Sequence, residues 1–136
     1  DLNDENIADL VELIIRFKVE GIIISNTTDK NRQSLMDSKK NEIGGLSGKP
    51  LTEISTNIIK KFYKKLDGKA KIIGVGGIDS GQDVYEKIIA GANLVQLYTG
   101  MVYKGPNIVK EIKEELVEIL TKEKIKNIDE IIGIKA

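Results

Sequence analysis

The sequence contains no cysteine and no histidine among its 136 residues. The absence of cysteine excludes a disulfide scaffold, a thiolate zinc site and a cysteine nucleophile. The absence of histidine excludes every mechanism in which this chain itself supplies an imidazole. If the protein is an enzyme, proton transfer by this chain would therefore fall to Asp, Glu, Lys, Tyr or Ser side chains.

The chain also lacks an excess of charge of either sign and a long hydrophobic run. Its 21 Lys and Arg residues balance its 21 Asp and Glu residues, which argues against nonspecific binding of nucleic acid. No apolar run reaches the roughly 18 residues that a membrane-spanning helix needs. The hydrophobic content of 40% and the charged content of 31% are typical of a globular domain. The length allows one domain, and we assign residues 1–136 to it without a second.

Three short apolar runs alternate with helical patterns along the chain. The runs cover residues 22–24, 72–75 and 94–98, and unbroken runs of this kind are typical of strands buried on both faces of a parallel sheet. Apolar residues at helical spacing precede, separate and follow them, which predicts the order α-β-α-β-α-β-α-α. The predicted helices run from Asp4 to Gly21, from Thr52 to Asp67, from Asp79 or Ser80 to Gly91, from 106 onward and over 127–132.

A parallel sheet of only three strands would leave two unpaired edges. The chain therefore resembles a slice of a larger α/β fold. In such folds ligands bind at the carboxyl ends of the strands. Polar residues or glycines follow all three predicted strands: Ser25, Asn26 and Thr27, then Gly76 and Gly77, then Tyr98, Thr99 and Gly100. The hydroxyls and the amide of the first group can bind a planar polar ligand, or they can simply form a turn.

Gly76 and Gly77 precede a predicted helix start, which is an arrangement that binds phosphate. The alternative is a tight turn that needs a positive φ. The dinucleotide fingerprint is absent because Asp79 stands where its third glycine is needed, and the P-loop is absent because Gly81 is not followed by lysine. A phosphate site shared with residues 98–100 remains, as in the last two loops of (β/α)8 barrels.

The glycine-rich segment 44–48 has two interpretations. It can be a flexible linker, or it can fold over a ligand and bind it through backbone amides. Spacing alone does not separate the two. Asp79 lies near the predicted site, but we expect it to cap a helix, and no general base stands out.

Four segments, in this order and spacing, resemble the carboxyl-terminal part of the quinone-dependent, class 2 dihydroorotate dehydrogenases. They are 21–28 (GIIISNTT), 44–51 (GGLSGKPL), 72–81 (IIGVGGIDSG) and 91–100 (GANLVQLYTG), and 102–106 (VYKGP) extends the likeness. The resemblance implies a (β/α)8 TIM barrel that holds FMN, of which this chain supplies strands six to eight with their helices. It also implies oxidation of dihydroorotate to orotate with a quinone as acceptor, in de novo pyrimidine biosynthesis, by a protein bound peripherally to a membrane.

The resemblance further implies roles for seven residues and none for a metal ion. Those expected to contact FMN are Ser25, Gly48, Gly77, Tyr98 and Thr99, and those expected to bind the substrate ring are Asn26 and Thr27. The family's catalytic Ser base, a flavin-contacting Lys and the membrane-docking helices correspond to positions before Asp1. We therefore expect no catalytic residue in this chain and no activity from it alone, without the amino-terminal part of the barrel.

Two alternatives remain open from the sequence. One is a flavin- or phosphate-binding half-barrel that catalyses nothing and self-associates through its unpaired strand edges. The other is a different FMN- or phosphate-binding barrel enzyme, in which the segments around Asn26 and Ser47 would match by chance.

Overall fold

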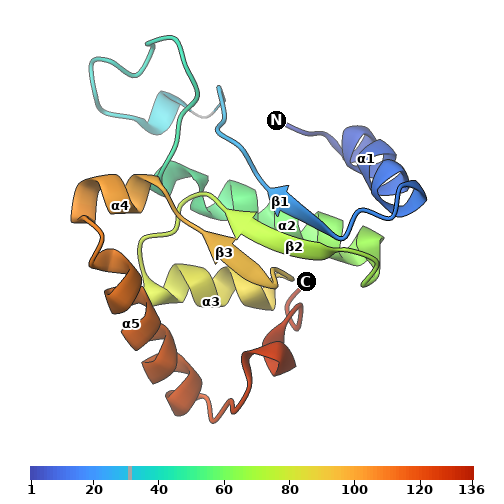
Figure 1. Cartoon of the computed structure of the whole chain (residues 1–136). Coiled ribbons are helices and arrows are strands. Elements are labelled where there is room, and N and C mark those ends of the chain that lie inside the picture. Colours follow the sequence, from blue (N-terminus) through green and yellow to red (C-terminus); the bar gives the residue numbers. More distant parts are fainter. Residues whose placement is uncertain (31) are drawn as a thin grey trace.

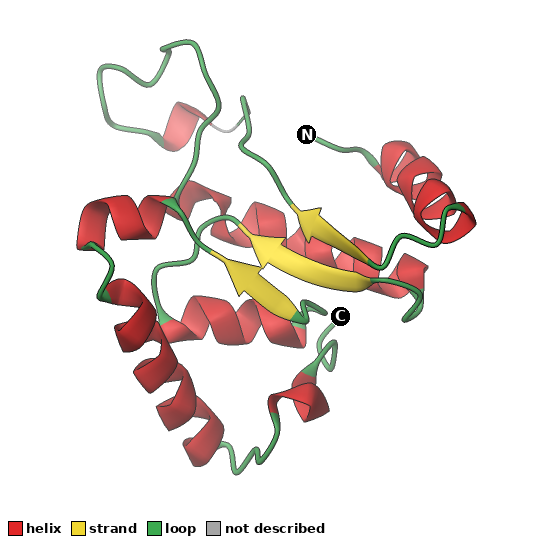
Figure 2. Cartoon of the chain, viewed as in Figure 1, coloured by secondary structure: helices red, strands yellow, loops and turns green. Residues whose placement is uncertain are grey.

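The computed structural model describes residues 1–30 and 32–136 (Figures 1 and 2). Its elements alternate between helices and strands. In chain order they are α1 (Asp4–Arg16), β1 (Gly21–Ile24), the 3-10 helices η1 (Arg32–Ser34) and η2 (Lys49–Leu51), α2 (Thr52–Leu66), β2 (Lys71–Val75), α3 (Gly81–Ile89), β3 (Leu94–Gln96), α4 (Thr99–Lys104), α5 (Ile108–Lys122) and the 3-10 helix η3 (Ile128–Ile131).

The three strands form one parallel sheet in the order β1-β2-β3. Ile23 pairs with Ile73, and Ile73 pairs with Leu94, so the strands are in step across the sheet. Helix α2 connects β1 to β2, and α3 connects β2 to β3. The α/β class and the parallel sheet predicted from the sequence are therefore confirmed. This topology brings the carboxyl ends of all three strands to the same edge.

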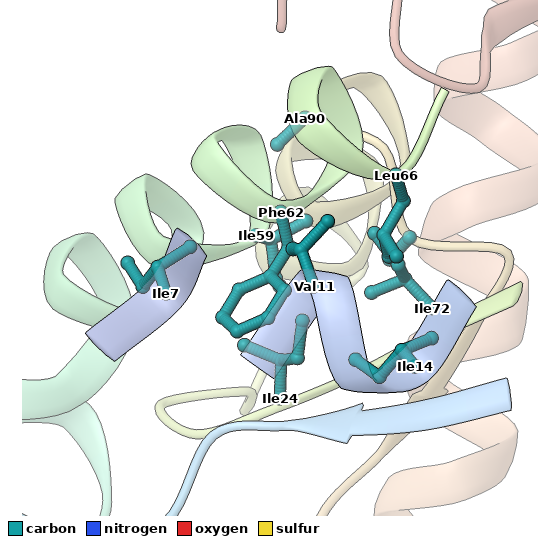
Figure 3. Packing of buried hydrophobic residues seen from close by; sticks show 10 residues of the cluster. Ile7, Val11, Ile14, Ile24, Ile59, Phe62, Leu66, Ile72 and Ala90 are labelled. Atoms are coloured by element: carbon teal, nitrogen blue, oxygen red, sulfur yellow. The ribbon is translucent and has the colours of Figure 1, made fainter. Parts of the chain in front are cut away.

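One face of the sheet packs against helices. Side chains alternate across a strand, and Ile24 and Ile72 point to the side where α1 and α2 lie (Figure 3). There they join a cluster of buried side chains: Ile7, Val11, Ile14, Ile24, Ile59, Phe62, Leu66, Ile72, Ala90 and Ala92. A second cluster joins α3, α5 and η3: Ile78, Val84, Ile88, Ile89, Ile108, Ile112 and Ile131. The two clusters fix α2 and α3 behind the strands.

The opposite face of the sheet carries no helix in the described part of the chain and is turned toward the viewer in Figure 1. Ile23 is 54% exposed there and Leu94 is 65% exposed. The prediction that the strands are buried on both faces is therefore wrong for this chain. The described helices lie on one side of the sheet only, so no described element covers the other side.

The observed helix ends correct two predictions at α1 and confirm two at α2. Its N-cap is Asn3, whose side chain accepts a hydrogen bond from Asn6 N–H at 2.8 Å, and not Asp4. The helix ends at Arg16, because Lys18 takes a positive φ of 51°, so Gly21 begins β1 instead of ending the helix. The predicted start of α2 at Thr52 is confirmed, and so is its end at Asp67, the left-handed C-cap.

At α3 one of the two predicted caps is confirmed, and three further elements differ from the sequence-based expectation. Ser80, one of the two predicted caps, is the N-cap of α3. The third strand ends at Gln96 instead of reaching residue 98, and the unpredicted helix α4 follows it. Six residues are too few to display a helical period. The predicted tail helix over 127–132 is a 3-10 helix.

Candidate functional site

A cavity of about 730 Å³ opens at the carboxyl edge of the sheet. Its walls come from all three strand ends, from the segment that follows β1 and from the start of α4. All seven residues predicted to contact a cofactor or a substrate line it: Ser25, Asn26, Thr27, Gly48, Gly77, Tyr98 and Thr99. The structure thus brings together residues that are far apart in the sequence, of which Ser25 and Thr99 are separated by 74 positions. Their individual roles remain predictions.

The end of β1 presents a polar turn. The Asn26 side-chain oxygen accepts a hydrogen bond from the Thr27 N–H at 2.8 Å, so this asparagine orders the turn. Neither the Asn26 side-chain nitrogen nor the Thr27 hydroxyl forms a hydrogen bond with a described residue. A non-proline cis peptide bond joins Ile24 to Ser25. The segment therefore forms the turn that the sequence allowed and still offers a donor and a hydroxyl to a polar ligand.

The end of β2 is a glycine turn held from behind by α2. The Ser55 hydroxyl lies 2.9 Å from the Gly76 carbonyl oxygen, and the Thr52 hydroxyl donates to the Gly77 carbonyl oxygen at 2.8 Å. Gly77 has a φ of 75°, and a Cβ there would lie 2.6 Å from the Thr52 Cα. Only glycine fits this position without strain. Gly77 is buried, yet no described residue accepts a hydrogen bond from its N–H or from that of Gly76.

The end of β3 leads directly into α4, with Tyr98 as the N-cap residue. The N–H groups of Thr99 and Gly100 also find no acceptor among the described residues, as is usual for the first turn of a helix. Gly48 packs against this turn, since a Cβ on it would lie 2.8 Å from the Thr99 Cγ2. Two neighbouring strand ends thus present unpaired N–H groups to one cavity. Such clusters of backbone donors bind anions.

The segment after β1 is folded against the cavity. Thr28 and Leu46 exchange two backbone hydrogen bonds of 3.2 and 2.7 Å, which close its base. The Arg32 guanidinium donates to the carbonyls of Lys40 at 3.1 Å, of Glu42 at 2.7 Å and of Gly44. Of the two interpretations of the glycine-rich segment, the structure therefore favours a loop that covers a site over a flexible linker.

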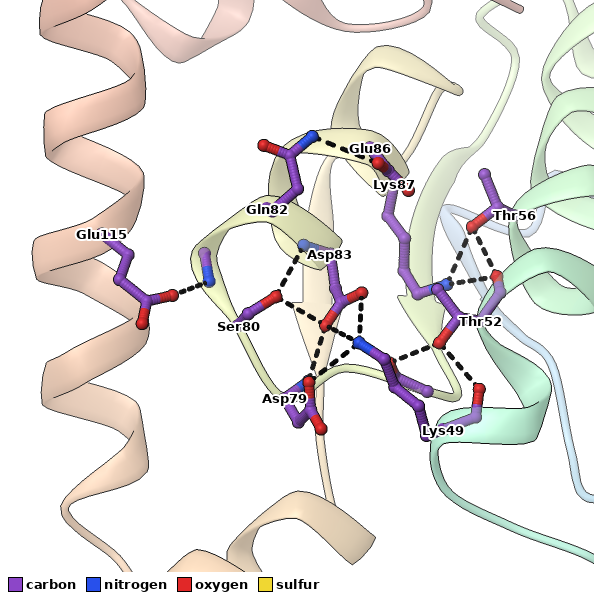
Figure 4. Close-up of polar contacts among 12 residues, drawn as sticks. Lys49, Thr52, Thr56, Asp79, Ser80, Gln82, Asp83, Glu86, Lys87 and Glu115 are labelled. Carbon is purple, nitrogen blue, oxygen red and sulfur yellow. Dashed lines mark hydrogen bonds and ion pairs between the residues drawn. The ribbon is translucent and has the colours of Figure 1, made fainter.

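An ion-pair cluster joins η2, which follows this loop, to the start of α3 (Figure 4). The Lys49 ammonium lies 2.9 Å from carboxylate oxygens of both Asp79 and Asp83. Asp83 also accepts hydrogen bonds from the Ser80 hydroxyl at 2.7 Å and from the Asp79 N–H at 3.1 Å. Burial by itself raises the pKa of Asp83, but these hydrogen bonds, that from Lys49 first, bring it below its usual value. Asp79 therefore holds Lys49, and the expectation that it caps the helix is wrong, because Ser80 is the N-cap of α3.

The sequence analysis missed Lys49, Ser55 and Lys87. Ser55 and Lys87 are both fully buried, and Lys87 donates a hydrogen bond of 2.7 Å to Ser55. A signal for both was present, because each occupies a helical position where the neighbouring stripe is apolar. Lys87 lies three residues after Val84, and Ser55 lies four residues before Ile59.

The described residues contain no group of three or more Asp or Glu side chains placed to hold a metal ion. None of the helices formed by these residues is long and apolar enough to cross a membrane.

Comparison with known proteins places the chain in a family. The family model described as dihydroorotate dehydrogenase matches residues 1–120. A dihydroorotate dehydrogenase (quinone) of Christiangramia forsetii is 48% identical over 87% of this chain. The mitochondrial proteins of that name from Arabidopsis thaliana and Mus musculus are 45% and 41% identical over 98% of it. The matches cover 34%, 29% and 34% of these relatives, so the chain spans about a third of their length.

Solved structures give the same result. The chain resembles the crystal structure of DHODH from Eimeria tenella in complex with ferulenol, with a TM-score of 0.94 and 40% identity. The likeness covers 98% of this chain and 36% of that one. The ligand-free form from the same organism matches with the same TM-score. With a family match over residues 1–120 and the fold agreeing over nearly its whole length, the chain belongs to the dihydroorotate dehydrogenase family.

Proposed function

We propose that residues 1–136 are the carboxyl-terminal portion of a single FMN-binding (β/α)8 barrel domain, with β1, β2 and β3 as strands six, seven and eight. The parallel order of the strands and their covering by helices on one side support this proposal. So does the share of its relatives that the chain spans, about a third. In such a barrel the uncovered sheet face lies inside, where side chains from other strands fill the interior.

The cofactor proposed for the site is FMN, and the observation that carries the proposal is the set of unpaired backbone donors. The N–H groups of Gly76, Gly77, Thr99 and Gly100 line one cavity and have no acceptor among the described residues. A phosphate group matches four such donors in charge and in hydrogen-bonding capacity. Tyr98 and Thr99 would hold the phosphate together with Gly77, and Ser25 and Gly48 would contact the rest of the cofactor.

The proposed substrate is dihydroorotate, with orotate as product and a quinone as the final electron acceptor. The free side-chain nitrogen of Asn26 and the hydroxyl of Thr27 suit the polar ring of that substrate. When bound, the flavin supplies the acceptor for the substrate's hydride and the route for electrons to the quinone. This chain's own residues bind and orient both molecules, and we propose no catalytic base among them.

The remaining proposals follow from the family. The parent protein would act in de novo pyrimidine biosynthesis and associate peripherally with a membrane. The relatives from Arabidopsis thaliana and Mus musculus are mitochondrial by name. The isolated chain is expected to show no turnover of dihydroorotate, because it holds only about a third of the length of its relatives.

Flavin titration tests the proposed cofactor site directly. The purified protein that carries this chain is titrated with FMN and, as the matched control, with riboflavin, which lacks the phosphate. We expect FMN to bind at least about ten times more tightly than riboflavin, because its phosphate forms charge-assisted hydrogen bonds. Equal binding of the two flavins, or binding of neither, would contradict an FMN phosphate site at Gly77 and Thr99.

A native mass spectrum tests the proposed barrel. A 15.0 kDa chain accompanied by FMN and a larger polypeptide is the outcome expected of a divided barrel, and FMN on one longer polypeptide that contains this sequence supports the proposal equally. Copies of the 15.0 kDa chain alone with bound flavin would instead favour a self-associating, non-catalytic half-barrel. Dihydroorotate turnover by the 15.0 kDa chain alone would contradict the proposal that this chain lacks the catalytic base and is inactive by itself.

A further inference from the structure

Lys87 is a fully buried lysine in the middle of the molecule. It lies on the inward face of α3, between Val84 and Ile88, which belong to the second apolar cluster. Its stem lies beside Gly74 on β2, where an added Cβ would lie 3.4 Å from the Lys87 Cδ, an ordinary contact distance. Buried lysines are rare because taking an ammonium out of water is costly. The position therefore needs a reason beyond packing.

The Lys87 ammonium is satisfied by the first turn of α2, as Figure 4 shows for Thr52 and Thr56. It donates to the Ser55 hydroxyl at 2.7 Å, to the Thr56 hydroxyl at 3.1 Å and to the Thr52 carbonyl oxygen at 3.4 Å. None of the ion pairs among the described residues includes it. Its direct hydrogen-bond partners are thus neutral groups, and no described carboxylate is within ion-pair distance of it.

These contacts determine how Ser55 is oriented. An ammonium can only donate, so the Ser55 oxygen must accept from Lys87 and use its own proton elsewhere. Three carbonyl oxygens are within reach of that proton, those of Leu51 at 2.8 Å, Gly76 at 2.9 Å and Thr52 at 3.3 Å. Of these, only the Gly76 carbonyl lies outside the start of α2, and no other described group donates to it. When the proton goes to Gly76, then Lys87, Ser55 and the Gly76 carbonyl form one chain of hydrogen bonds, from the core to the glycine turn.

The direction of the Gly76 carbonyl decides where the next N–H points. The Gly76 carbonyl and the Gly77 N–H belong to one planar, trans peptide group, so they point in opposite directions. With the carbonyl turned toward Ser55 on α2, the Gly77 N–H points away from α2. Gly77 lines the large cavity, so its free N–H is directed to the side on which a ligand would lie.

We propose that Lys87 is a positioning residue for anion binding: through Ser55 it fixes the Gly76–Gly77 peptide so that the Gly77 N–H is presented to a phosphate group. The inference rests on the proposed function, in which that phosphate is the one of FMN. The buried positive charge adds to the effect, because an unpaired cation behind the turn attracts an anion in front of it.

Burial lowers the pKa of Lys87 to about 8, against the opposing charges of Asp83 and Glu86 and with the help of Lys49. These are the charged groups that face it, the first two from α3 and the third from η2. Lys87 is thus mostly protonated at neutral pH and loses its charge under mildly alkaline conditions. The phosphate of FMN has already lost its second proton by then, since that pKa is about 6.

The test compares FMN with riboflavin in the purified protein that carries this chain. The Lys87→Met variant keeps the stem and removes the charge. We expect its dissociation constant for FMN to rise about tenfold, with little change for riboflavin. Its folding should be preserved, because replacing a buried charge with an apolar side chain of similar volume is often neutral or stabilising. Equal losses for both flavins, or no loss for either, would overturn the proposal.

Two hydroxyl variants separate positioning from packing and keep the test valid if Lys87→Met does not fold. Ser55→Ala removes the link to Gly76 and leaves the ammonium in place, and we expect the same selective loss of FMN binding. Thr56→Val is the matched control, because it removes another acceptor of Lys87 that does not contact the turn. It should leave both flavin affinities unchanged. Equal effects of the two variants would contradict a route through Ser55.

The pH dependence gives a second readout. In the unmodified protein the affinity for FMN should fall about threefold or more between pH 7 and 9, as Lys87 loses its proton, while riboflavin binding stays level. Lys87→Met should abolish this difference, and its persistence in the variant would contradict the assignment. If the unmodified protein itself does not prefer FMN over riboflavin, the proposed phosphate site fails, which is a separate result from failure of the Lys87 variants alone.

Discussion

Single residues at the glycine turn are constrained by both conformation and space. Gly77 has a φ of 75°, and an added Cβ would meet the backbone of Thr52. Gly68 has the same φ of 75°, but an added Cβ there would meet nothing within 4 Å. The pair therefore separates the cost of backbone strain from the cost of close packing.

We predict that Gly77→Ala lowers the free energy of unfolding by about 2–4 kcal/mol, since strain and overpacking add. Gly68→Ala should cost about 1 kcal/mol through strain alone. Urea unfolding measures both. Gly77→Ala should also abolish selective FMN binding, whereas Gly68→Ala should retain it. Similar stability losses in the two variants would show that the approach to Thr52 carries no cost.

Asp83 is the residue whose charge connects the loop to α3. Its pKa is lowered in the folded protein, so the folded state binds fewer protons than the unfolded state as the carboxyl titrates. The stabilisation is therefore complete above the unfolded pKa of about 4 and is lost as the pH falls through the lower, folded pKa.

We predict that Asp83→Asn lowers stability by about 1 kcal/mol at pH 7. The amide keeps the shape and an acceptor for the Ser80 hydroxyl but loses the charge that pairs with Lys49. The difference from the unmodified protein should shrink below about pH 4. Asp79→Asn serves as the control. It removes the other contact to the same lysine, which is more exposed to solvent, so it should lower stability less. Denaturant unfolding at pH 7 and pH 3 measures the effect, and a constant difference at both would be inconsistent with it.

At the scale of elements, the helix ends that the sequence predicted are those fixed by local signals. Asp67 ends α2 as its left-handed C-cap, and the Ser80 side chain caps α3 by accepting from the Asp83 N–H, whereas no side chain caps the start of α2 at Thr52. Such caps depend on residues within one turn, so a single sequence contains them. Helix α4 and the fold of the loop after β1 depend on contacts with distant residues, for example Thr99 with Ser47. No local pattern could reveal those.

Inside the candidate site, too, features fixed by local patterns were predictable and features that depend on contacts between distant residues were not. The three strand ends were predictable because parallel strands place their carboxyl ends together. The support behind them was not, because it is made by side chains of α2 and α3 whose meeting depends on the packing of the two helices. Only Ser55 and Lys87 are marked in the sequence, because each is a polar residue at a helical position where apolar residues are expected.

Arg32 organises the loop after β1 through bonds to three carbonyls. We predict that Arg32→Ala increases cleavage after Lys39 and Lys40 by a lysine-specific protease about three- to tenfold, because local opening becomes easier. Arg16→Ala is the matched control, since that arginine lies at the end of α1 and stacks on Phe17. Timed digestion followed by mass spectrometry measures the rates. Equal rates in the two variants would mean that Arg32 does not limit opening of the loop.

At the scale of the whole molecule, one sheet face is covered and the other is not. The slice of a parallel fold was predictable from the order of strands and helices, whereas the missing cover is visible only once the helices are seen on one side. Ile23 and Leu94 are more than half exposed on that face, and two sheet edges lack a strand neighbour among the described residues. Exposed apolar faces and unpaired edges promote association.

Leu94→Lys is therefore predicted to have opposite effects in the isolated chain and in the complete barrel. In the isolated chain, Leu94→Lys should reduce self-association at little cost in stability, because the side chain is 65% exposed. Val117→Lys on α5, where the side chain is 61% exposed, is the control and should leave association unchanged. Sedimentation velocity over a range of concentrations distinguishes them.

In the complete barrel that we propose, Leu94 would face the filled interior. There Leu94→Lys should lower the free energy of unfolding by about 3 kcal/mol or more, since it buries an unpaired charge. Val117→Lys should again change little, because α5 keeps its outer position in both settings. Equal tolerance of Leu94→Lys in the isolated chain and in the longer protein would mean that this face stays open to solvent, and the barrel assignment would have to be abandoned.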